Sequence, residues 1–385
     1  MKAKLYYLLF SIYSSVLLVG LHWFLIRNKK HIAKKDGIAA LPYYPKNWPG
    51  GEDRIAAWQQ HFNTDNISFS VFWCWEATDL KTFLKAQKEN NINQAYKINF
   101  LLLKNRYRAL KHAVFYKTMW TQRALIPLFP YKKSYFEKLI CKYHPHTVFD
   151  FYDADYESNY RLVMDTVKYA AKVTVASRFL ESKFKPLNHN VAFVRYAIKT
   201  DKFNTEKKKY NDDKTRIGWM GSPGNARQLT YIKKDLKNIE NEFPNVLFTF
   251  TCRALPDLGL KRAEINAWGK NDFIYEGWLS SLDIGIVPFL EQSDRIKAKI
   301  SMKTLEFMAN KVALISSPHV HSDKLSHAES FLLAENDTWY ANIKLLLEDE
   351  KRRKEIAEKG YRIFNKYHTY HHVYPELKKV LLSTV

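Results

Sequence analysis

The sequence contains few cysteines, and none of them is spaced for a shared metal ion or a disulfide framework. Its three cysteines, Cys74, Cys141 and Cys252, lie far apart in the chain. Cysteine-based zinc sites and small disulfide-rich domains both depend on several suitably spaced cysteines, so both classes are excluded. Three isolated cysteines are instead typical of buried small side chains in a protein of a reducing compartment.

The chain is also short of acidic residues. It has 39 Asp and Glu residues against 61 Lys and Arg residues, which gives a formal net charge of +22 at pH 7. Proteins with such a charge bind nucleic acid, anionic membranes or phosphate-bearing ligands. The sequence is rich in Lys, Tyr, Phe, Ile and Asn, a bias that a source genome can produce. The charge is therefore no indication of nucleic-acid binding, and we expect no nucleic-acid partner.

A long apolar run near the N-terminus, residues 5–26, contains no ionised side chain. It is long enough to cross a hydrocarbon core about 30 Å thick. The basic stretch "RNKKHIAKK" follows it, where a cleaved signal peptide would have small residues. More positive charge on this side places the rest of the chain in the cytoplasm. The sequence therefore predicts a single-pass anchor, residues 1–30, in the inner (plasma) membrane. A buried first helix and an interfacial helix are the alternatives.

Beyond this run, short apolar strands alternate with amphipathic helices, a pattern typical of parallel sheets covered on both faces. The charged stretch "TEKKKYNDDKT", residues 205–215, interrupts the alternation, which then starts again. No sequence repeat links the two halves. We expect two Rossmann-like, doubly wound α/β domains, residues 37–208 and 213–385. Ligands of such sheets bind at the carboxyl ends of the strands, so two facing sheets would form a cleft.

The stretch "KISMKTLEFMANKVALISSP", residues 299–318, reads as a helix followed by a buried strand. Lys299 and Lys303 are four residues apart and share one helical face, which Glu306 extends by one turn. Ser301 can cap the start of the helix. Cations and free amides there suit a diphosphate, and a carboxylate suits ribose hydroxyls. The alternative is a solvated Lys/Glu face.

Two glycine-containing turns follow predicted strands. In "IGWMGSPGN" the turn contains Gly221 and Ser222, and Arg227 lies in the helix that follows. In "PKNWPGGEDR" a helix begins at Gly50 and Gly51. Backbone amides at the start of a helix can approach an anion closely when no Cβ intervenes. Neither turn has the spacing of a dinucleotide fingerprint, and an ordinary turn without a ligand is the alternative for both.

Three acidic residues crowd the end of another predicted strand in "FDFYDADY", namely Asp150, Asp153 and Asp155. An Asp-x-Asp pair holds a divalent metal ion in another class of sugar transferases. The pair is also common by chance. We therefore predict no metal site, and we expect one of these acids to face the cleft.

Taken together, these motifs resemble the GT-B glycosyltransferases of family four, the group one transferases. The resemblance extends over nearly the whole chain from residue 37. It is carried by "LPYYPKNWPGGEDRI", "IGWMGSPGNARQLTYI", "LDIGIVPF", "KAKISMKTLEFMANKVALISSP" and "ENDTWYANIKLLLEDEKRRKEIAEKG". It implies a GT-B fold in which the Gly-Gly loop of the first domain faces the donor phosphates. It also implies that Glu306 binds the nucleotide ribose and that transfer retains the anomeric configuration.

The sequence departs from this family at several positions. Ser222 stands where relatives often have an arginine that binds the diphosphate, and Arg227 stands where they have a lysine. Ala298 replaces a glutamate next to the donor sugar, and Asn310 replaces a glycine before the last strand. The histidine that touches the sugar in relatives has no clear counterpart; Lys117 lies only loosely in its region.

We therefore predict a hexosyltransferase-like enzyme that uses a nucleotide diphosphate-sugar of UDP or GDP type, without a cofactor. The acceptor would be a cell-envelope glycan or a lipid-linked molecule. Arg227, Lys299 and Lys303 would stabilise the departing diphosphate, helped by the Ser301-capped helix and the amides of Gly221 and Ser222. The alternatives are a membrane-tethered basic scaffold, which predicts cations spread over the surface, and a sugar-nucleotide epimerase with the GT-B fold.

Overall fold

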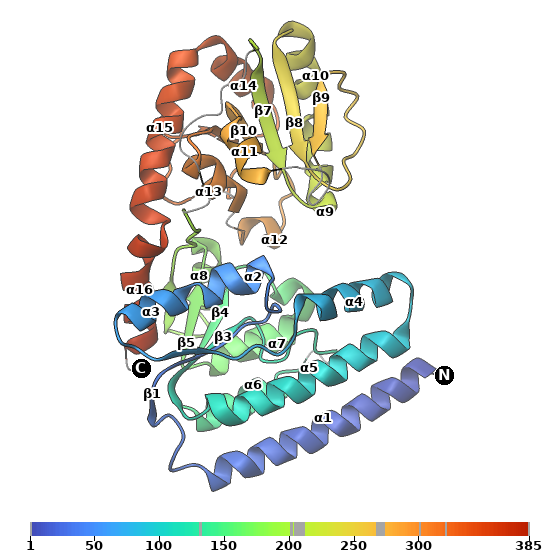
Figure 1. Cartoon of the computed structure of the whole chain (residues 1–385), viewed down its shortest axis with the longest axis vertical. Coiled ribbons are helices and arrows are strands. Elements are labelled where there is room, and N and C mark those ends of the chain that lie inside the picture. Colours follow the sequence, from blue (N-terminus) through green and yellow to red (C-terminus); the bar gives the residue numbers. More distant parts are fainter. Residues whose placement is uncertain are drawn as a thin grey trace. The chain divides into compact units, whose positions relative to one another are not determined.

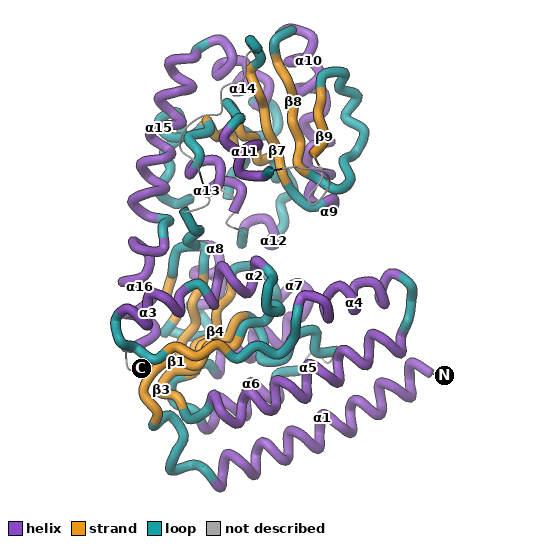
Figure 2. Tube along the Cα trace, viewed as in Figure 1, coloured by secondary structure: helices purple, strands orange, loops and turns teal. Residues whose placement is uncertain are grey.

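The computed structural model describes residues 2–130, 133–200, 203, 212–266, 274–299, 302–319 and 322–383. The chain divides into two compact units, and Figures 1 and 2 show the elements of each. Unit 1 contains Met1–Arg195 and Tyr374–Val385, and unit 2 contains Tyr196–Val373. Each unit has its own parallel sheet.

Unit 1 is built on a sheet with the strand order β2-β1-β3-β4-β5-β6, in which every neighbouring pair is parallel. The order reverses between β1 and β3, which is the switch point where ligands of doubly wound sheets bind. Its elements, in chain order, are α1 (Lys2–Arg27), β1 (Lys35–Leu41), α2 (Pro49–Gly51), the π-helical turn η1 (Glu52–Ala56), α3 (Trp58–Thr64), β2 (Phe69–Val71), α4 (Ala77–Lys88), α5 (Ile92–Ala113), β3 (Tyr116–Gln122), α6 (Tyr135–Tyr143), β4 (Thr147–Phe151), α7 (Tyr156–Tyr169), β5 (Lys172–Val175), α8 (Arg178–Phe184) and β6 (Val191–Phe193).

Unit 2 has the strand order β12-β11-β10-β7-β8-β9, again all parallel, with its switch point between β7 and β10. This is the order of dinucleotide-binding sheets. Its elements are β7 (Thr215–Met220), α9 (Pro223–Ala226), the 3-10 helix η2 (Arg227–Ile232), α10 (Lys233–Glu242), β8 (Val246–Thr251), β9 (Ala263–Asn266), α11 (Tyr275–Ser280), β10 (Ile284–Val287), α12 (Asp294–Lys297), α13 (Met302–Ala309), β11 (Ala313–Ser316), β12 (Leu332–Leu333), α14 (Trp339–Glu348), α15 (Glu350–Tyr367) and the first turn of α16 (Tyr370–Leu382).

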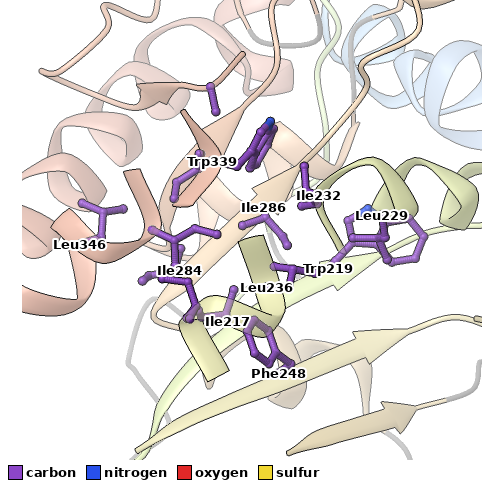
Figure 3. Close-up of a cluster of buried hydrophobic side chains, with 14 of the residues drawn as sticks. Ile217, Trp219, Leu229, Ile232, Leu236, Phe248, Ile284, Ile286, Trp339 and Leu346 are labelled. Atoms are coloured by element: carbon purple, nitrogen blue, oxygen red, sulfur yellow. The ribbon is translucent and has the colours of Figure 1, made fainter. Parts of the chain in front are cut away.

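The continuous apolar runs of the sequence become the central strands. Every residue of β8, β10 and β11 is buried, because helices cover both faces of a parallel sheet. Figure 3 shows the core that results in unit 2, where Ile217, Phe248 and Ile284 of the sheet pack with Leu236 and Trp339 of the helices. This core fixes the strand ends at which the candidate site lies.

The division of the chain differs from the expected boundary at residues 208–213. Most of the charged stretch there lies outside the described residues, and the contacts change from one unit to the other between Arg195 and Tyr196. Helix α16 begins in unit 2, and its continuation from Tyr374 belongs to unit 1. There Lys172 of β5 donates to the carbonyl oxygen of Val380 at 2.9 Å. The end of the chain therefore completes unit 1, which the sequence pattern did not predict.

The apolar N-terminal run forms helix α1, as expected, and α1 is long and apolar enough to cross a membrane. Within unit 1 it also packs against α5 and α6 (Figure 1). Phe10, Leu21 and Leu25 are fully buried there. The predicted anchor is therefore also part of the packing of unit 1.

Candidate active site

The candidate site of unit 2 lies at the switch point of its sheet. Strand β7 ends at Met220 and β10 ends at Val287. Helix α13 connects β10 to β11 and packs against both strands. The residues that follow these two strands and the start of α13 therefore come together, as the doubly wound order requires.

Lys303 has the most unusual environment of the predicted residues. Its Nζ atom is buried and has no hydrogen-bond partner in the described part of the chain, although the residue as a whole is partly exposed. The ammonium group lies 4.8 Å from the ring centre of Trp219 and 5.1 Å from that of Phe289. Burial, together with the nearby charge of Lys299, lowers the pKa of Lys303 to about 7, against the opposing effect of Glu306. A buried ammonium group without a hydrogen-bond partner among the described residues favours the binding of an anion.

Lys299 approaches the same aromatic side chain. Its Nζ lies 5.2 Å from the ring centre of Phe289, so the two predicted lysines meet on one ring directly after β10. Ser301, the predicted cap, lies outside the described residues. Ala298, which stands where relatives have a glutamate, is fully buried, so this position contributes packing.

Glu306 is half-buried one turn after Lys303, and a tyrosine that the motifs did not indicate holds its carboxylate. The Tyr275 hydroxyl donates to Glu306 Oε2 at 3.0 Å and lies 2.6 Å from Met220 Sδ. Burial raises the pKa of Tyr275, and the nearby Glu306 raises it further. Tyr275 therefore stays protonated and orients the carboxylate. The only signal in the sequence was its place at the start of a helix before the strand "DIGIV".

The turn after β7 is arranged differently from the prediction. The Gly221 amide donates to the Thr251 carbonyl at 3.0 Å, so it continues the sheet and is not a donor for a ligand. A Cβ atom at Gly221 would lie 2.8 Å from Lys303 Nζ and 2.8 Å from the Trp219 ring. Glycine is needed here because Lys303 approaches so closely. Ser222 is exposed and stands at the N-terminus of α9, where its carbonyl accepts from the Asn225 amide.

Arg227 is exposed and forms an ion pair with Glu291, with 2.8 Å between Nη2 and Oε1. The next residue, Gln228, is buried and accepts from the Leu290 amide at 3.1 Å. Two contacts therefore join the turn after β7 to the loop after β10. The role of Arg227 in diphosphate binding remains a prediction.

In unit 1 the two predicted glycines close a turn. The Gly51 amide donates to the Trp48 carbonyl at 3.0 Å, and the Gly50 carbonyl accepts from Gln122 Nε2 at 2.7 Å. A Cβ atom at Gly50 would lie 2.7 Å from the Tyr44 ring. These glycines therefore allow the turn to pack on the end of β3. That they face a donor phosphate remains a prediction.

A second charged cluster lies at the switch point of unit 1, and the motifs did not indicate its central residue. Arg123 directly follows β3 and contacts both Asp153 and Asp155, with 2.8 Å between Nη1 and Asp155 Oδ1. Its guanidinium group lies 5.1 Å from the ring centre of Tyr44 and 4.6 Å from that of Tyr152. Burial raises the pKa of the Asp155 carboxyl to about 7, against the opposing effect of Arg123.

The third acid, Asp150, has a structural role. It is fully buried and accepts two hydrogen bonds from Arg54, at 2.7 and 2.9 Å, and one from Thr174 at 2.7 Å. The described residues contain no group of three His, Cys, Asp or Glu side chains that could hold a metal ion. The acids of "FDFYDADY" are therefore engaged by arginines, and metal independence remains a prediction.

Lys117 does not lie at the switch point of unit 1. It is near the start of β3, where it is exposed and forms an ion pair with Asp36 at 2.5 Å. The carboxyl end of the same strand carries Gln122 and Arg123. The loose correspondence of Lys117 with a sugar-binding histidine is therefore wrong, because Lys117 lies at the opposite end of β3.

Comparison with known proteins agrees with this arrangement. Residues 265–379 match a family model described as glycosyl transferase-like. The structure is similar to HepE of Anabaena in complex with UDP and glucose (TM-score 0.59, 13% identity, 90% of this chain and 99% of that one). The chain has the GT-B fold, and its matched region is glycosyl transferase-like. The predicted resemblance, fold and enzyme class are thereby confirmed, whereas membership of family four remains a prediction.

Other similar structures include a glycosyltransferase from Rickettsia africae (TM-score 0.55, 12% identity, 91% of this chain and 100% of that one). Sucrose-phosphate synthase from Thermosynechococcus elongatus is also similar (TM-score 0.55, 11% identity, 74% and 78%). At these identities the likeness establishes the fold alone. No curated protein matches the sequence closely enough to add to it.

Proposed function

We propose that this glycosyltransferase binds a nucleotide diphosphate-sugar of UDP or GDP type in unit 2 and transfers the sugar to an acceptor bound by unit 1. The buried, unpartnered Nζ of Lys303 is the observation that carries the proposal. A buried ammonium group without a hydrogen-bond partner is unfavourable, and the oxygen atoms of a diphosphate would supply acceptors and negative charge. That the similar HepE structure contains UDP supports this choice of ligand.

The chemistry explains why a cation is needed at this place. The bond between the anomeric carbon and the β-phosphate oxygen breaks, and its electron pair stays on that oxygen. The nucleoside diphosphate therefore gains negative charge as it leaves, and Lys303 and Lys299 stabilise that charge in the transition state. Glu306, held by Tyr275, accepts hydrogen bonds from the ribose hydroxyls. We propose that Arg227 and Ser222 also contribute to donor binding.

Unit 1 offers a different surface for the acceptor. The Tyr44 and Tyr152 rings flank Arg123, and Asp153 and Asp155 offer carboxylates beside it. Aromatic faces and fixed carboxylates suit a sugar with its apolar ring face and hydroxyl groups. We propose that the acceptor is a cell-envelope glycan or a lipid-linked molecule, that transfer retains the anomeric configuration, and that it needs no metal ion. We also propose that the protein works on the cytoplasmic side of the inner membrane.

The test is to incubate the full-length protein with a panel of UDP- and GDP-sugars and to measure thermal stabilisation. Sugar transfer to acceptors in a membrane extract is then measured as release of the nucleoside diphosphate. We expect stabilisation by one nucleotide class and acceptor-dependent release with the retained anomer in the product. If no nucleotide-sugar stabilises the protein, the donor assignment is wrong. Binding followed by interconversion of the sugar without transfer would favour the epimerase.

A further inference from the structure

Helix α1 has an inner face that is fixed to unit 1 along its length. Near its start, the ring centres of Tyr6 and Tyr96 of α5 are 5.4 Å apart, and those of Phe10 and Phe100 of α5 are 5.1 Å apart. Near its end, His22 Nε2 is hydrogen-bonded to the hydroxyl of Tyr143 of α6 at 2.8 Å. The helix is therefore held at both ends and follows α5 (Figure 1).

The outer face of α1 is apolar and exposed. Its side chains recur at helical spacing and have exposed fractions from 46% to 69%: Leu5, Leu8, Leu9, Ile12, Val16, Val19, Trp23 and Ile26. An exposed apolar strip of this length is unusual on a soluble surface and marks a contact with a membrane or a partner. The basic residues Arg27, Lys29 and Lys30 follow directly.

Packing on α5 argues against a helix that crosses the bilayer. Lys97, Lys104 and Arg108 of α5 are exposed, and they would be drawn into the hydrocarbon if α1 crossed it with its contacts intact. Charged side chains are strongly unfavourable there. If α1 instead separated from α5, the contacts of Phe10 and Tyr6 would be lost. A helix that lies in the plane of the interface keeps these contacts and still covers its apolar strip.

A basic groove runs beside this strip, between α1 and α6. One cavity of about 740 Å³ is lined by Ser11 and Ser15 of α1, by Lys133 and by Arg161 of α7. A second cavity of about 320 Å³ continues it and is lined by Lys138 and Lys142.

One acid offsets part of this charge. Asp165 is paired with Lys138 at 2.9 Å and also interacts electrostatically with Arg161, whereas Lys133 and Lys142 have no acidic partner among the described ion pairs. The groove is therefore positively charged and lies next to an apolar surface. This arrangement is complementary to an anionic phospholipid, whose phosphate group is negative and whose acyl chains are apolar.

We propose that unit 1 docks on an anionic bilayer with α1 lying in the plane of the interface. The outer face of α1 enters the acyl region, and the groove between α1 and α6 binds the phosphate group of a bilayer phospholipid. This attachment does not depend on sugar transfer. It replaces the single span predicted from the sequence with the interfacial alternative.

The orientation of α1 is tested by depth measurements on the full-length protein. Leu5→Cys, Val16→Cys and Ile26→Cys variants, each with Cys141→Ser, are labelled with a fluorophore. They are bound to vesicles of equal parts phosphatidylglycerol and phosphatidylcholine that contain brominated lipids. We expect all three labels at one shallow depth, open to a quencher added outside. A deep Val16 label with the Leu5 label protected inside the vesicle would establish a span. A dimer formed through α1 that does not bind vesicles would also overturn the proposal.

The groove is tested by charge removal. Lys133→Gln, Lys142→Gln and Arg161→Gln are combined in one variant. The matched control carries Lys351→Gln, Lys354→Gln and Lys359→Gln on α15 of unit 2. Each basic residue near an anionic surface strengthens binding to the membrane. We therefore expect the loss of three such charges to lower the vesicle affinity of the groove variant about a hundredfold. We expect little change in the control, unchanged thermal stability of both variants, and weak binding of the wild type to phosphatidylcholine alone. Equal losses in the groove variant and the control would overturn the groove assignment.

Discussion

Both units place a basic side chain at the switch point of a parallel sheet, Arg123 after β3 in unit 1 and Lys303 on α13 in unit 2. Arg123 contacts two carboxylates, Asp153 and Asp155, and lies between aromatic rings. Lys303 also lies on aromatic rings, but its Nζ has no partner within the described chain. Similar positions in the two sheets therefore contain a cation that is ion-paired in one unit and a cation without a hydrogen-bond partner among the described residues in the other.

This difference between the two cations suggests that the two units bind ligands of different charge. Because Arg123 is neutralised within unit 1, it adds little attraction for an anion and serves to fix the acids and tyrosines around it. Lys303 is destabilising until an anion arrives, and the cost of its burial is recovered on binding. Buried charged groups with strongly shifted pKa values are typical of ligand-binding and catalytic sites. The comparison therefore supports our proposals that the phosphate-bearing donor binds to unit 2 and that the acceptor binds to unit 1.

The largest effect is expected from the buried ion pair that supports the unit 1 cluster. Asp150→Ala leaves the guanidinium group of Arg54 buried without a counter-ion, which costs about 3–5 kcal/mol. Urea denaturation of the full-length protein should show this loss in free energy of unfolding. The matched control, Glu89→Ala, removes the exposed pair with Lys85 and should change stability very little. A small effect of Asp150→Ala would mean that the unit 1 cluster is not held by this pair.

A smaller effect is expected for the ribose site of unit 2. Glu306→Gln keeps the shape of the side chain but removes its charge, and hydrogen bonds to a charged group contribute about 1.5–3 kcal/mol. We expect donor affinity to fall about tenfold to a hundredfold. Calorimetry with the preferred nucleoside diphosphate and its 2′-deoxy analogue should show discrimination in the wild type and none in Glu306→Gln. Glu348→Gln on α14 is the control. Equal discrimination in all three proteins would contradict the ribose assignment.

The pH dependence sharpens the contrast between the two cations. Because the pKa of Lys303 is about 7 in the folded protein and 10.5 ordinarily, the unfolded chain binds more protons between these values. The contribution of Lys303 to stability therefore rises with pH through that window. Affinity for a diphosphate should do the opposite and fall above pH 7, by at most about tenfold per pH unit, as the ammonium group deprotonates.

Nucleoside diphosphate affinity measured between neutral and alkaline pH tests this. Lys303→Arg keeps its charge throughout and should remove the fall at high pH, while Lys303→Met should bind weakly at every pH. A fall of the same size in the wild type and in Lys303→Arg would mean that another group titrates.

The smallest effect is expected for metal removal. Asp153 is engaged by Arg123, and we expect turnover to be unchanged in EDTA. The same assay on Asp153→Ala should show at most a change in acceptor KM, because Asp155 still holds Arg123. Loss of turnover in EDTA that Mn²⁺ restores in the wild type but not in Asp153→Ala would support a metal site at the Asp-Ala-Asp pair.

The sequence predicted features that follow from local periodicity. Alternating strands and helices predicted two parallel sheets. The four-residue spacing of Lys299 and Lys303 predicted one shared helical face, but Lys299 precedes α13, which begins at Met302, and the two lysines meet at the Phe289 ring instead. Gly221 was predicted to offer its backbone amide to a ligand. In the structure a glycine is needed there because a Cβ atom would collide with Lys303. Local spacing cannot distinguish these two reasons for a glycine.

Features that depend on contacts between distant segments were not predicted. Tyr275 reaches Glu306 from another helix, and Arg123 meets acids that follow the next strand. The return of the chain from Tyr374 into unit 1 depends on partners such as Lys172. The packing of α1 against α5 could not be predicted from the sequence either, because an apolar run has the same composition whether it crosses a membrane or packs on a protein surface.

We propose above that the buried ammonium group of Lys303 binds the diphosphate of the donor. Calorimetric titration of the full-length protein with UDP and with GDP, in the wild type, Lys303→Met and the exposed control Lys351→Met, tests it most directly. We expect one of the two nucleotides to bind to the wild type and to Lys351→Met. We expect Lys303→Met to lose about tenfold to a hundredfold in affinity, and its thermal stability should be unchanged or raised because a buried charge is removed. Equal affinity of all three proteins, or lowered stability of Lys303→Met with unchanged affinity, would contradict it.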